Sequence, residues 1–250
     1  MPRSLADIAA SVSSPLESRL FCEYGAVFVT AATPPPGIIF SDAGQVREFQ
    51  SSLAIRAARF GEWEIELQAP AMRALLEASS EMANRGGSIT PRAADAGRRD
   101  YDDTVRLWDR NVTRGLDHWQ SEGRLTAARA QSIRGLTPMD QVRAILEIED
   151  SEQLYFGTYF DRSILHSVAA PGTSQHLSML AFDVAEYSEA TLEGVLNNFG
   201  WYRTVTSDLP HFTYLGYGEG ELAGRGLKLV EQETSGISYR FWVPNIEVLR

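Results

Sequence analysis

Residues 174–183 read SQHLSMLAFD and are followed by Val184. The stretch sets His176 and Asp183 at either end of a mostly apolar run. A short apolar run bounded by turn residues is typical of a buried strand, which we expect over 177–184. Regular backbone at the edge of such a strand can hold a polar side chain in a fixed geometry.

The chain before this stretch is dominated by helix signals. Ser14, Pro15 and Glu17 supply a cap, a proline at the first helical position and an acid three residues after the cap. The clearest amphipathic pattern places Met72, Leu75, Leu76 and Met82 on one face. We predict a short strand at 88–90 and helices over 14–25, 41–53, 70–84, 101–119 and 137–145.

The chain after residue 184 favours strands. A helix is expected from Ser188 to Asn198, then a strand over 212–217 and a closing hairpin over 228–243 that turns at Ser235-Gly236. Helices early and strands late predict an α+β fold with an antiparallel sheet and helices packed on one face. We predict a helical N-terminal extension over 1–60 and a main domain over 61–250 that ends in the hairpin.

Composition narrows the function. A net charge of -10 argues against nucleic-acid binding, which needs clustered Lys and Arg. No apolar run approaches the length of a membrane-spanning helix, so membrane insertion is not expected. Cys22 is the only cysteine, which excludes an intramolecular disulfide and a cysteine-based zinc cluster. If an export signal has been removed, the protein belongs in the periplasm or outside the cell; otherwise it belongs in the cytoplasm.

Any bound metal must therefore be held by histidine and carboxylate. His176, Asp183 and His211 supply three such ligands, the number that a catalytic zinc ion takes from a protein while one position stays open. Asp208 precedes His211 by three residues and could move protons to and from water and the leaving amine. Spacing alone leaves open that both histidines are ordinary core residues.

Residues 174–183 resemble the Ser-x-His-x-x-Gly-x-Ala-x-Asp signature of the D-alanyl-D-alanine carboxypeptidases and dipeptidases. These zinc peptidases share their fold with Hedgehog signalling domains. The segment from Asp208 to Phe212 is similar to the family's second motif, and its Asp-x-Pro-His-Phe form is typical of L-alanyl-D-glutamate endolysins of the same group. Met179 departs from the pattern, because it stands where the family has glycine.

The resemblance implies a role for each matching residue. His176, Asp183 and His211 would bind Zn²⁺, and Asp208 would be the catalytic acid and base. Ser174 would line the substrate site. Arg99 stands where the family has a substrate-holding arginine at the start of a helix, and it could grip a substrate carboxylate through a bidentate pair.

Three functions follow from the resemblance. The first is a zinc peptidase that acts on a peptidoglycan-derived peptide as a D-Ala-D-Ala carboxypeptidase. The second is an L-Ala-D-Glu endopeptidase, and the third is a zinc-binding module without catalysis, as in Hedgehog-type domains. The acid at position 208 favours an enzyme, because a structural zinc site does not need it. The sequence leaves the oligomeric state open.

Overall fold

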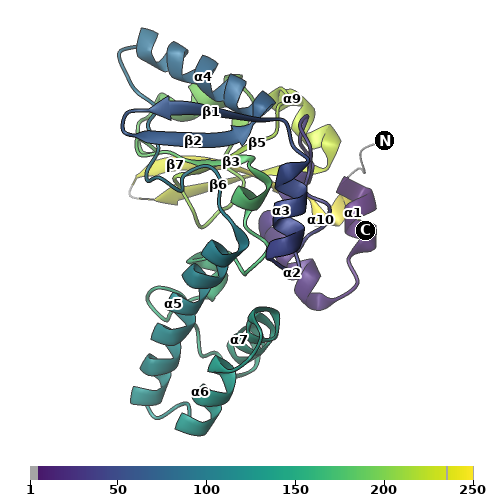
Figure 1. The fold of residues 1–250 in the computed structure, drawn as a ribbon, viewed down its shortest axis with the longest axis vertical. Helices are drawn as coiled ribbons and strands as arrows, with labels where there is room; N and C mark the ends of the chain where they lie inside the picture. Colours follow the sequence, from purple (N-terminus) through teal and green to yellow (C-terminus); the bar gives the residue numbers. More distant parts are fainter. Residues whose placement is uncertain (1–4, 235, 250) are drawn as a thin grey trace. The chain divides into compact units, whose positions relative to one another are not determined.

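The computed structural model describes residues 5–234 and 236–249 (Figure 1). The chain forms two compact units. The first contains the described residues up to 38, residues 44–99 and those from 175 onward, and the second contains 39–43 and 100–174. Helices and small antiparallel sheets make this an α+β protein, as predicted. The boundary at residue 60 stays a prediction about domain organisation.

Three small antiparallel sheets belong to the first unit. Two of them are hairpins, and the third has the strand order β3-β5-β4. Their strands are β1 (Ile55–Phe60), β2 (Trp63–Gln68), β3 (Ala181–Asp183), β4 (Trp201–Tyr202), β5 (His211–Tyr214), β6 (Leu227–Thr234) and β7 (Ile237–Pro244). The middle strand β5 is buried along its whole length. The three-stranded sheet is therefore a rigid support for side chains at its edge.

Helices complete the first unit. They are α1 (Leu5–Ser11), α2 (Pro15–Tyr24), α3 (Ala43–Ser51), α4 (Ala69–Asn84), α8 (Leu192–Asn198), α9 (Glu219–Leu222) and α10 (Ile246–Leu249), with 3-10 turns at Gly25–Phe28, Gln175–Ser178 and Ala223–Arg225. The predicted face of α4 is confirmed, because Met72, Leu75 and Met82 are almost fully buried. They pack into one apolar cluster with Phe182 and Phe212 of the three-stranded sheet.

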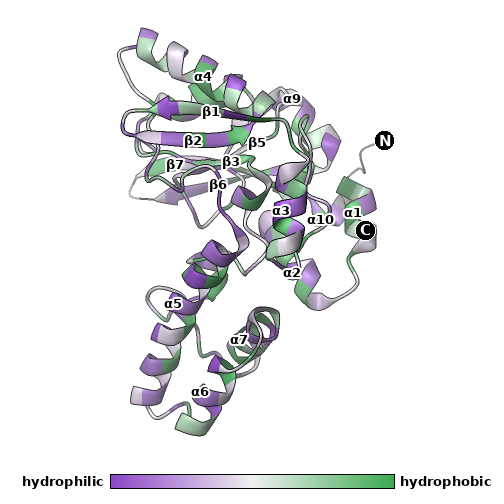
Figure 2. Cartoon of the chain, in the orientation of Figure 1, coloured by the Kyte–Doolittle hydropathy of each residue, from purple (hydrophilic) through white to green (hydrophobic). Residues whose placement is uncertain are grey.

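The second unit is helical. It contains α5 (Tyr101–Ser121), α6 (Ala127–Arg134), α7 (Pro138–Glu152) and a 3-10 turn at Ile164–His166. Asp100 and Asp103 form a reciprocal capping box at the start of α5. Figure 2 shows hydrophilic and hydrophobic residues alternating along these helices, as expected of helices with one buried face. None of the described helices combines the length and apolar character that a membrane crossing needs.

Three predicted elements differ from the structure. The strand expected over 177–184 is a 3-10 turn (Gln175–Ser178) followed by the shorter β3, because Met179 takes a left-handed conformation (φ 56°) that interrupts extended backbone. No strand forms at 88–90; the neighbouring Pro91 instead makes an isolated bridge with Val184. The helix expected from Ser188 begins at Leu192.

The sequence pattern predicted one of the two hairpins and missed the other. The closing hairpin is confirmed, with Thr234 paired to Ile237, although Ser235 of its turn lies outside the described residues. The β1–β2 hairpin was not predicted. Five of the six residues of β1 are exposed or only partly buried, so its sequence shows no alternation of apolar and polar residues.

Candidate metal centre

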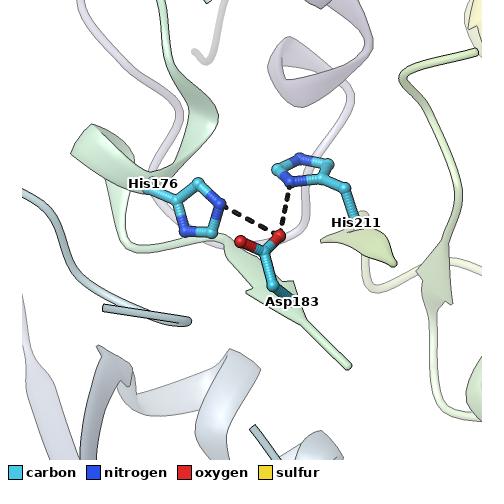
Figure 3. Close-up of side chains that lie close together, drawn as sticks. All are labelled: His176, Asp183 and His211. Carbon is cyan, nitrogen blue, oxygen red and sulfur yellow. Dashed lines mark hydrogen bonds and ion pairs between the residues drawn. The ribbon is translucent and has the colours of Figure 1, made fainter. Parts of the chain in front are cut away.

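Sheet pairing brings the two sequence motifs together. Asp183 ends β3 and His211 begins β5, and the two residues are directly opposite each other in the antiparallel ladder. His176 lies in the 3-10 turn that precedes β3. Figure 3 shows the three side chains converging, with both imidazoles facing the carboxylate.

Residues 91–99 hold this arrangement in place through hydrogen bonds to Asp183 and His176. Arg92 donates its backbone N–H to the carbonyl of Asp183 (2.9 Å), and Asp183 donates its own N–H to Ala96 (3.0 Å). The Nδ1 atom of His176 is 2.7 Å from the carbonyl oxygen of Gly97. A Cβ at Gly97 would lie 2.7 Å from the side chain of Ile65, so the segment can pass this close only with glycine.

The donor atoms of the three residues have the spacing of a metal site. One oxygen of Asp183, Oδ1, lies 3.2 Å from Nε2 of His176 and 3.0 Å from Nδ1 of His211. All three donor atoms lie within 4.8 Å of one another. Ligand atoms at about 2.1 Å from a tetrahedral zinc ion are about 3.4 Å apart. The chain thus contains a His-His-Asp group that could hold a zinc ion.

The hydrogen bonds around His176 leave one of its ring nitrogens suited to a cation. A carbonyl oxygen can only accept, so His176 carries its proton on Nδ1 and presents the lone pair of Nε2 to Asp183. That Nε2 atom is buried and makes no hydrogen bond to any described residue, because its approach to Asp183 lacks hydrogen-bond geometry. A buried nitrogen lone pair facing a carboxylate is unfavourable unless a proton or a metal ion lies between them.

Electrostatics favour the metal-binding forms of His176 and Asp183. Burial lowers the pKa of His176 and so favours the neutral imidazole. Burial by itself raises the pKa of Asp183, but the positive charge of the His176 and His211 rings in their protonated form outweighs it and holds that pKa well below its usual range. Asp183 is therefore ionised, and burial favours loss of the His176 proton, which gives each of these two residues the form that binds zinc.

Arg99 lies beside the metal group. Its Nη2 donates to Oδ2 of Asp183 (2.8 Å), and its Nε donates to Asp95 (3.1 Å). The guanidinium therefore holds the carboxylate oxygen opposite the one that faces the histidines. Neither bond uses Nη1, which stays available as a donor for the predicted substrate carboxylate.

Asp208 lies close enough to share the electrostatics of the group. Burial raises its pKa, while the imidazole of His211 lowers it and the charge of Asp183 raises it further. The loop before β5 is held by the buried Arg203, whose Nε donates to the carbonyl of Leu209 (2.8 Å). Asp208 also accepts the backbone N–H of His211 through its carbonyl oxygen (3.2 Å).

Ser174 and Gln175 immediately precede His176 in the chain. Ser174, predicted to line the substrate site, is buried and is the last residue of the second unit. Gln175 was not predicted, yet its Oε1 lies 2.8 Å from Nε2 of His211. The only hint in the sequence was its place beside His176, since its partners are far away along the chain.

Comparison with known proteins gave only partial similarities. No protein-family model matches the chain, and no curated protein does. One similar structure is a vancomycin-resistance D,D-pentapeptidase, VanY, in complex with Zn(II), with a TM-score of 0.36 and 16% identity over 66% of this chain and 82% of that one. Another is the LD-carboxypeptidase LdcB, described in terms of peptidoglycan recognition, with a TM-score of 0.38 and 16% identity over 64% of each chain. Both are peptidases, the class that the sequence resembles. Both TM-scores are below 0.5, so these similarities assign no role to any residue of this chain.

Proposed function

We propose that this chain is a zinc-dependent peptidase that hydrolyses a peptide bond in a peptidoglycan-derived peptide. The observation that best supports this proposal is that His176, Asp183 and His211 converge. The carboxyl of Asp208 lies close enough to interact electrostatically with this group. The resemblance of both motifs to D-Ala-D-Ala peptidases supports a D-Ala-D-Ala carboxypeptidase. The Asp-x-Pro-His-Phe form of the second motif supports an L-Ala-D-Glu endopeptidase as the alternative.

The residues divide the work of hydrolysis. His176, Asp183 and His211 would hold the zinc ion, which supplies Lewis-acid chemistry when bound. Asp208 accepts the proton of the attacking water and delivers it to the leaving amine. Its raised pKa suits this exchange, because a group that must both take and give a proton works best with a pKa close to the working pH.

Arg99 supports the reaction in two ways. It keeps Asp183 oriented through one hydrogen bond, and its Nη1 can bind a carboxylate of the substrate. A carboxypeptidase requires a cation for the terminal carboxylate, so this residue fits the D-Ala-D-Ala activity. A zinc module without catalysis is less favoured, because a structural site has no use for Asp208.

The test combines metal content with turnover. Elemental analysis of wild type should find about one zinc ion per chain, and His176→Ala should lose it. His118→Ala is the matched control, since His118 stacks on Phe160 in the second unit and should keep the zinc. Asp208→Asn should keep the zinc and lose turnover by a factor of about 10² to 10⁴.

Two substrates distinguish the activities. Release of D-alanine from a peptide ending in D-Ala-D-Ala indicates the carboxypeptidase, and cleavage of an L-Ala-D-Glu muropeptide indicates the endopeptidase. A wild-type protein that takes up no zinc, or an Asp208→Asn variant with full activity, would contradict the proposal. Zinc uptake without cleavage of either peptide would leave the non-catalytic module as the function.

A further inference from the structure

We infer that Gln175 is a positioning residue that fixes the proton of His211 on Nε2 and so keeps Nδ1 free to bind a cation. The inference deepens the proposed function, because it concerns the same metal group. It rests on a chain of hydrogen bonds that begins at the end of α2 and finishes at His211.

The first link sets the orientation of the Gln175 amide. Its Nε2 donates to the backbone carbonyl of Tyr24 (2.9 Å). A carbonyl oxygen cannot donate, so the nitrogen of the amide must be the atom that faces Tyr24. The opposite atom, Oε1, therefore faces the interior of the site, and the amide cannot reverse without setting two acceptors against each other.

The second link gathers donors around Oε1. The hydroxyl of Thr213 donates to this oxygen, and the hydroxyl of Thr204 lies 3.2 Å from it. Both threonines are fully buried, and their hydroxyl oxygens are 2.7 Å apart, so Thr204 has its one proton to share between Thr213 and Oε1. The carbonyl end of the amide is thus fixed as an acceptor by groups on β5 and on the loop after β4.

The third link reaches His211. Its Nε2 lies 2.8 Å from Oε1 of Gln175, and because that oxygen only accepts, Nε2 must carry the proton. A neutral imidazole has one protonated nitrogen, so Nδ1 keeps its lone pair. That lone pair points to Oδ1 of Asp183 (3.0 Å), where the cation would lie.

His176 reaches the same state by different means. Its proton is fixed on Nδ1 by the carbonyl of Gly97, and its free atom is Nε2. The two histidines thus present opposite ring nitrogens to one carboxylate oxygen, and each tautomer is set by a separate acceptor. A partner that holds the second nitrogen of a metal-binding histidine typically changes metal affinity by about 10 to 100-fold when it is removed.

The same bonds give the N-terminal segment a role at the site. Tyr24 is the last residue of α2, and its carbonyl is the acceptor that orients Gln175. The predicted N-terminal extension would therefore support the metal group through one backbone oxygen and need not contribute a ligand.

Two measurements test the inference. The ¹⁵N chemical shifts of the two ring nitrogens of His211, recorded on metal-free protein, report which nitrogen carries the proton. Competition with a chelating dye gives the zinc dissociation constant. We expect the Nε2–H tautomer in wild type, and in Gln175→Leu we expect a mixed or reversed tautomer with zinc binding weaker by about 10 to 100-fold.

Three variants make the result decisive. Gln141→Leu removes another buried glutamine, which bonds to Ile133 in the second unit, and it should change neither measurement. Gln175→Glu keeps an acceptor opposite His211 and should keep the wild-type tautomer, while its second carboxylate oxygen faces the carbonyl of Tyr24 and should lower stability. Thr213→Val removes a donor to Oε1 but leaves Gln175 in place, so it should also keep that tautomer. This variant still tests the inference if Gln175→Leu does not fold.

The outcomes separate the inference from the proposed function. An unchanged tautomer in Gln175→Leu, or a wild-type His211 protonated on Nδ1, would overturn the inference even if the protein binds zinc and cleaves peptides. A wild type that binds no zinc would overturn the proposed function, while the ring shifts would still decide the role of Gln175.

Discussion

Met179 adopts a backbone conformation that side chains disfavour. Its φ of 56° lies in the left-handed region, which costs a residue other than glycine about 1–2 kcal/mol. Its N–H bonds to His176 (3.0 Å), and its carbonyl accepts from Gln68 (3.1 Å). The side chain is fully buried, so its packing offsets the strain. The family that the sequence resembles has glycine here, and the chain keeps a conformation that glycine readily adopts.

This position should reverse the usual order of alanine and glycine. In ordinary backbone, glycine is less stable than alanine by about 0.5–1 kcal/mol. At position 179 we expect Met179→Gly to be more stable than Met179→Ala by about 1 kcal/mol, because only alanine retains the left-handed strain. Both should be less stable than wild type, since each loses a buried side chain. Urea unfolding measures the three free energies, and an alanine variant equal to or better than the glycine variant would contradict the strain.

How much of the site could be predicted differs from residue to residue. His176, Asp183 and His211 were predicted as a set, and the structure brings them together, because β3 pairs Asp183 with His211 and the turn before β3 carries His176. Gln175 could not be predicted, since it bonds to Tyr24, which only the tertiary fold brings near. The contact of Arg99 with Asp183 has the same origin, because sequence spacing carries no information about which side chain an arginine will meet.

At the scale of elements, the entry into β4 depends on a close approach of two backbones. Gly200 has a φ of 78°, and its carbonyl accepts the N–H groups of Leu215 (2.8 Å) and Gly216 (3.1 Å). A Cβ at Gly200 would lie 2.7 Å from the Cα of Gly216. Two backbones this close leave no side chain to move aside, so glycine is required here.

Gly200→Ala should therefore destabilise the protein by more than about 1 kcal/mol, because it adds left-handed strain to a clash with backbone. Gly194→Ala is the matched control. Gly194 lies exposed on α8 with nothing within 4 Å of an added Cβ, so alanine there should raise stability by about 0.5–1 kcal/mol. Thermal midpoints of the two variants should move in opposite directions, and a shared direction would show that the approach of Gly216 does not govern the effect.

Element prediction followed the strength of the local pattern. The helix α4 was predicted from the regular spacing of its buried face, and the closing hairpin from the Ser235-Gly236 turn signal between two strand-like runs. The run over 177–184 was equally apolar, yet Met179 divides it, and a left-handed methionine has no signature in a single sequence. The strand β1 was missed for the opposite reason, because an exposed strand needs few apolar residues.

At the scale of the whole molecule, a cation bound by His176, Asp183 and His211 would couple folding to metal concentration. A ligand that binds only the native state stabilises it by about 2.7 kcal/mol when its concentration is 100 times the dissociation constant. Excess zinc should therefore raise the melting temperature at pH 8, and a chelator should lower it. Within the first unit the three ligands are lost together on unfolding, so a transition of the second unit that melts separately should not move.

The zinc effect should weaken in acid. Protons compete with zinc for the imidazoles, and because burial lowers the pKa of His176, this ring takes up protons only at a pH below its ordinary range. Stabilisation by zinc should be complete at pH 8 and should shrink as the pH falls through that lowered value. Calorimetry at pH 8 and pH 5, with zinc or with chelator, measures the difference. A zinc shift that persists in His176→Ala would place the ion elsewhere.

The order of the two units along the chain determines where the length of the protein can vary during evolution. The larger segment of the second unit, residues 100–174, departs after Arg99 and returns at Gln175, while the contact of His176 with the Gly97 carbonyl and the bond from Arg99 to Asp183 lie within the first unit. The residues at both ends of this segment are thus fixed by bonds that do not involve the segment itself. Because each doubling of the length of a flexible loop costs only about 0.6 kcal/mol, residues can be gained or lost in the exposed loops between the helices of this segment with little effect on the metal group. This stretch of the gene is where insertions and deletions should be tolerated, and where relatives should differ most in length.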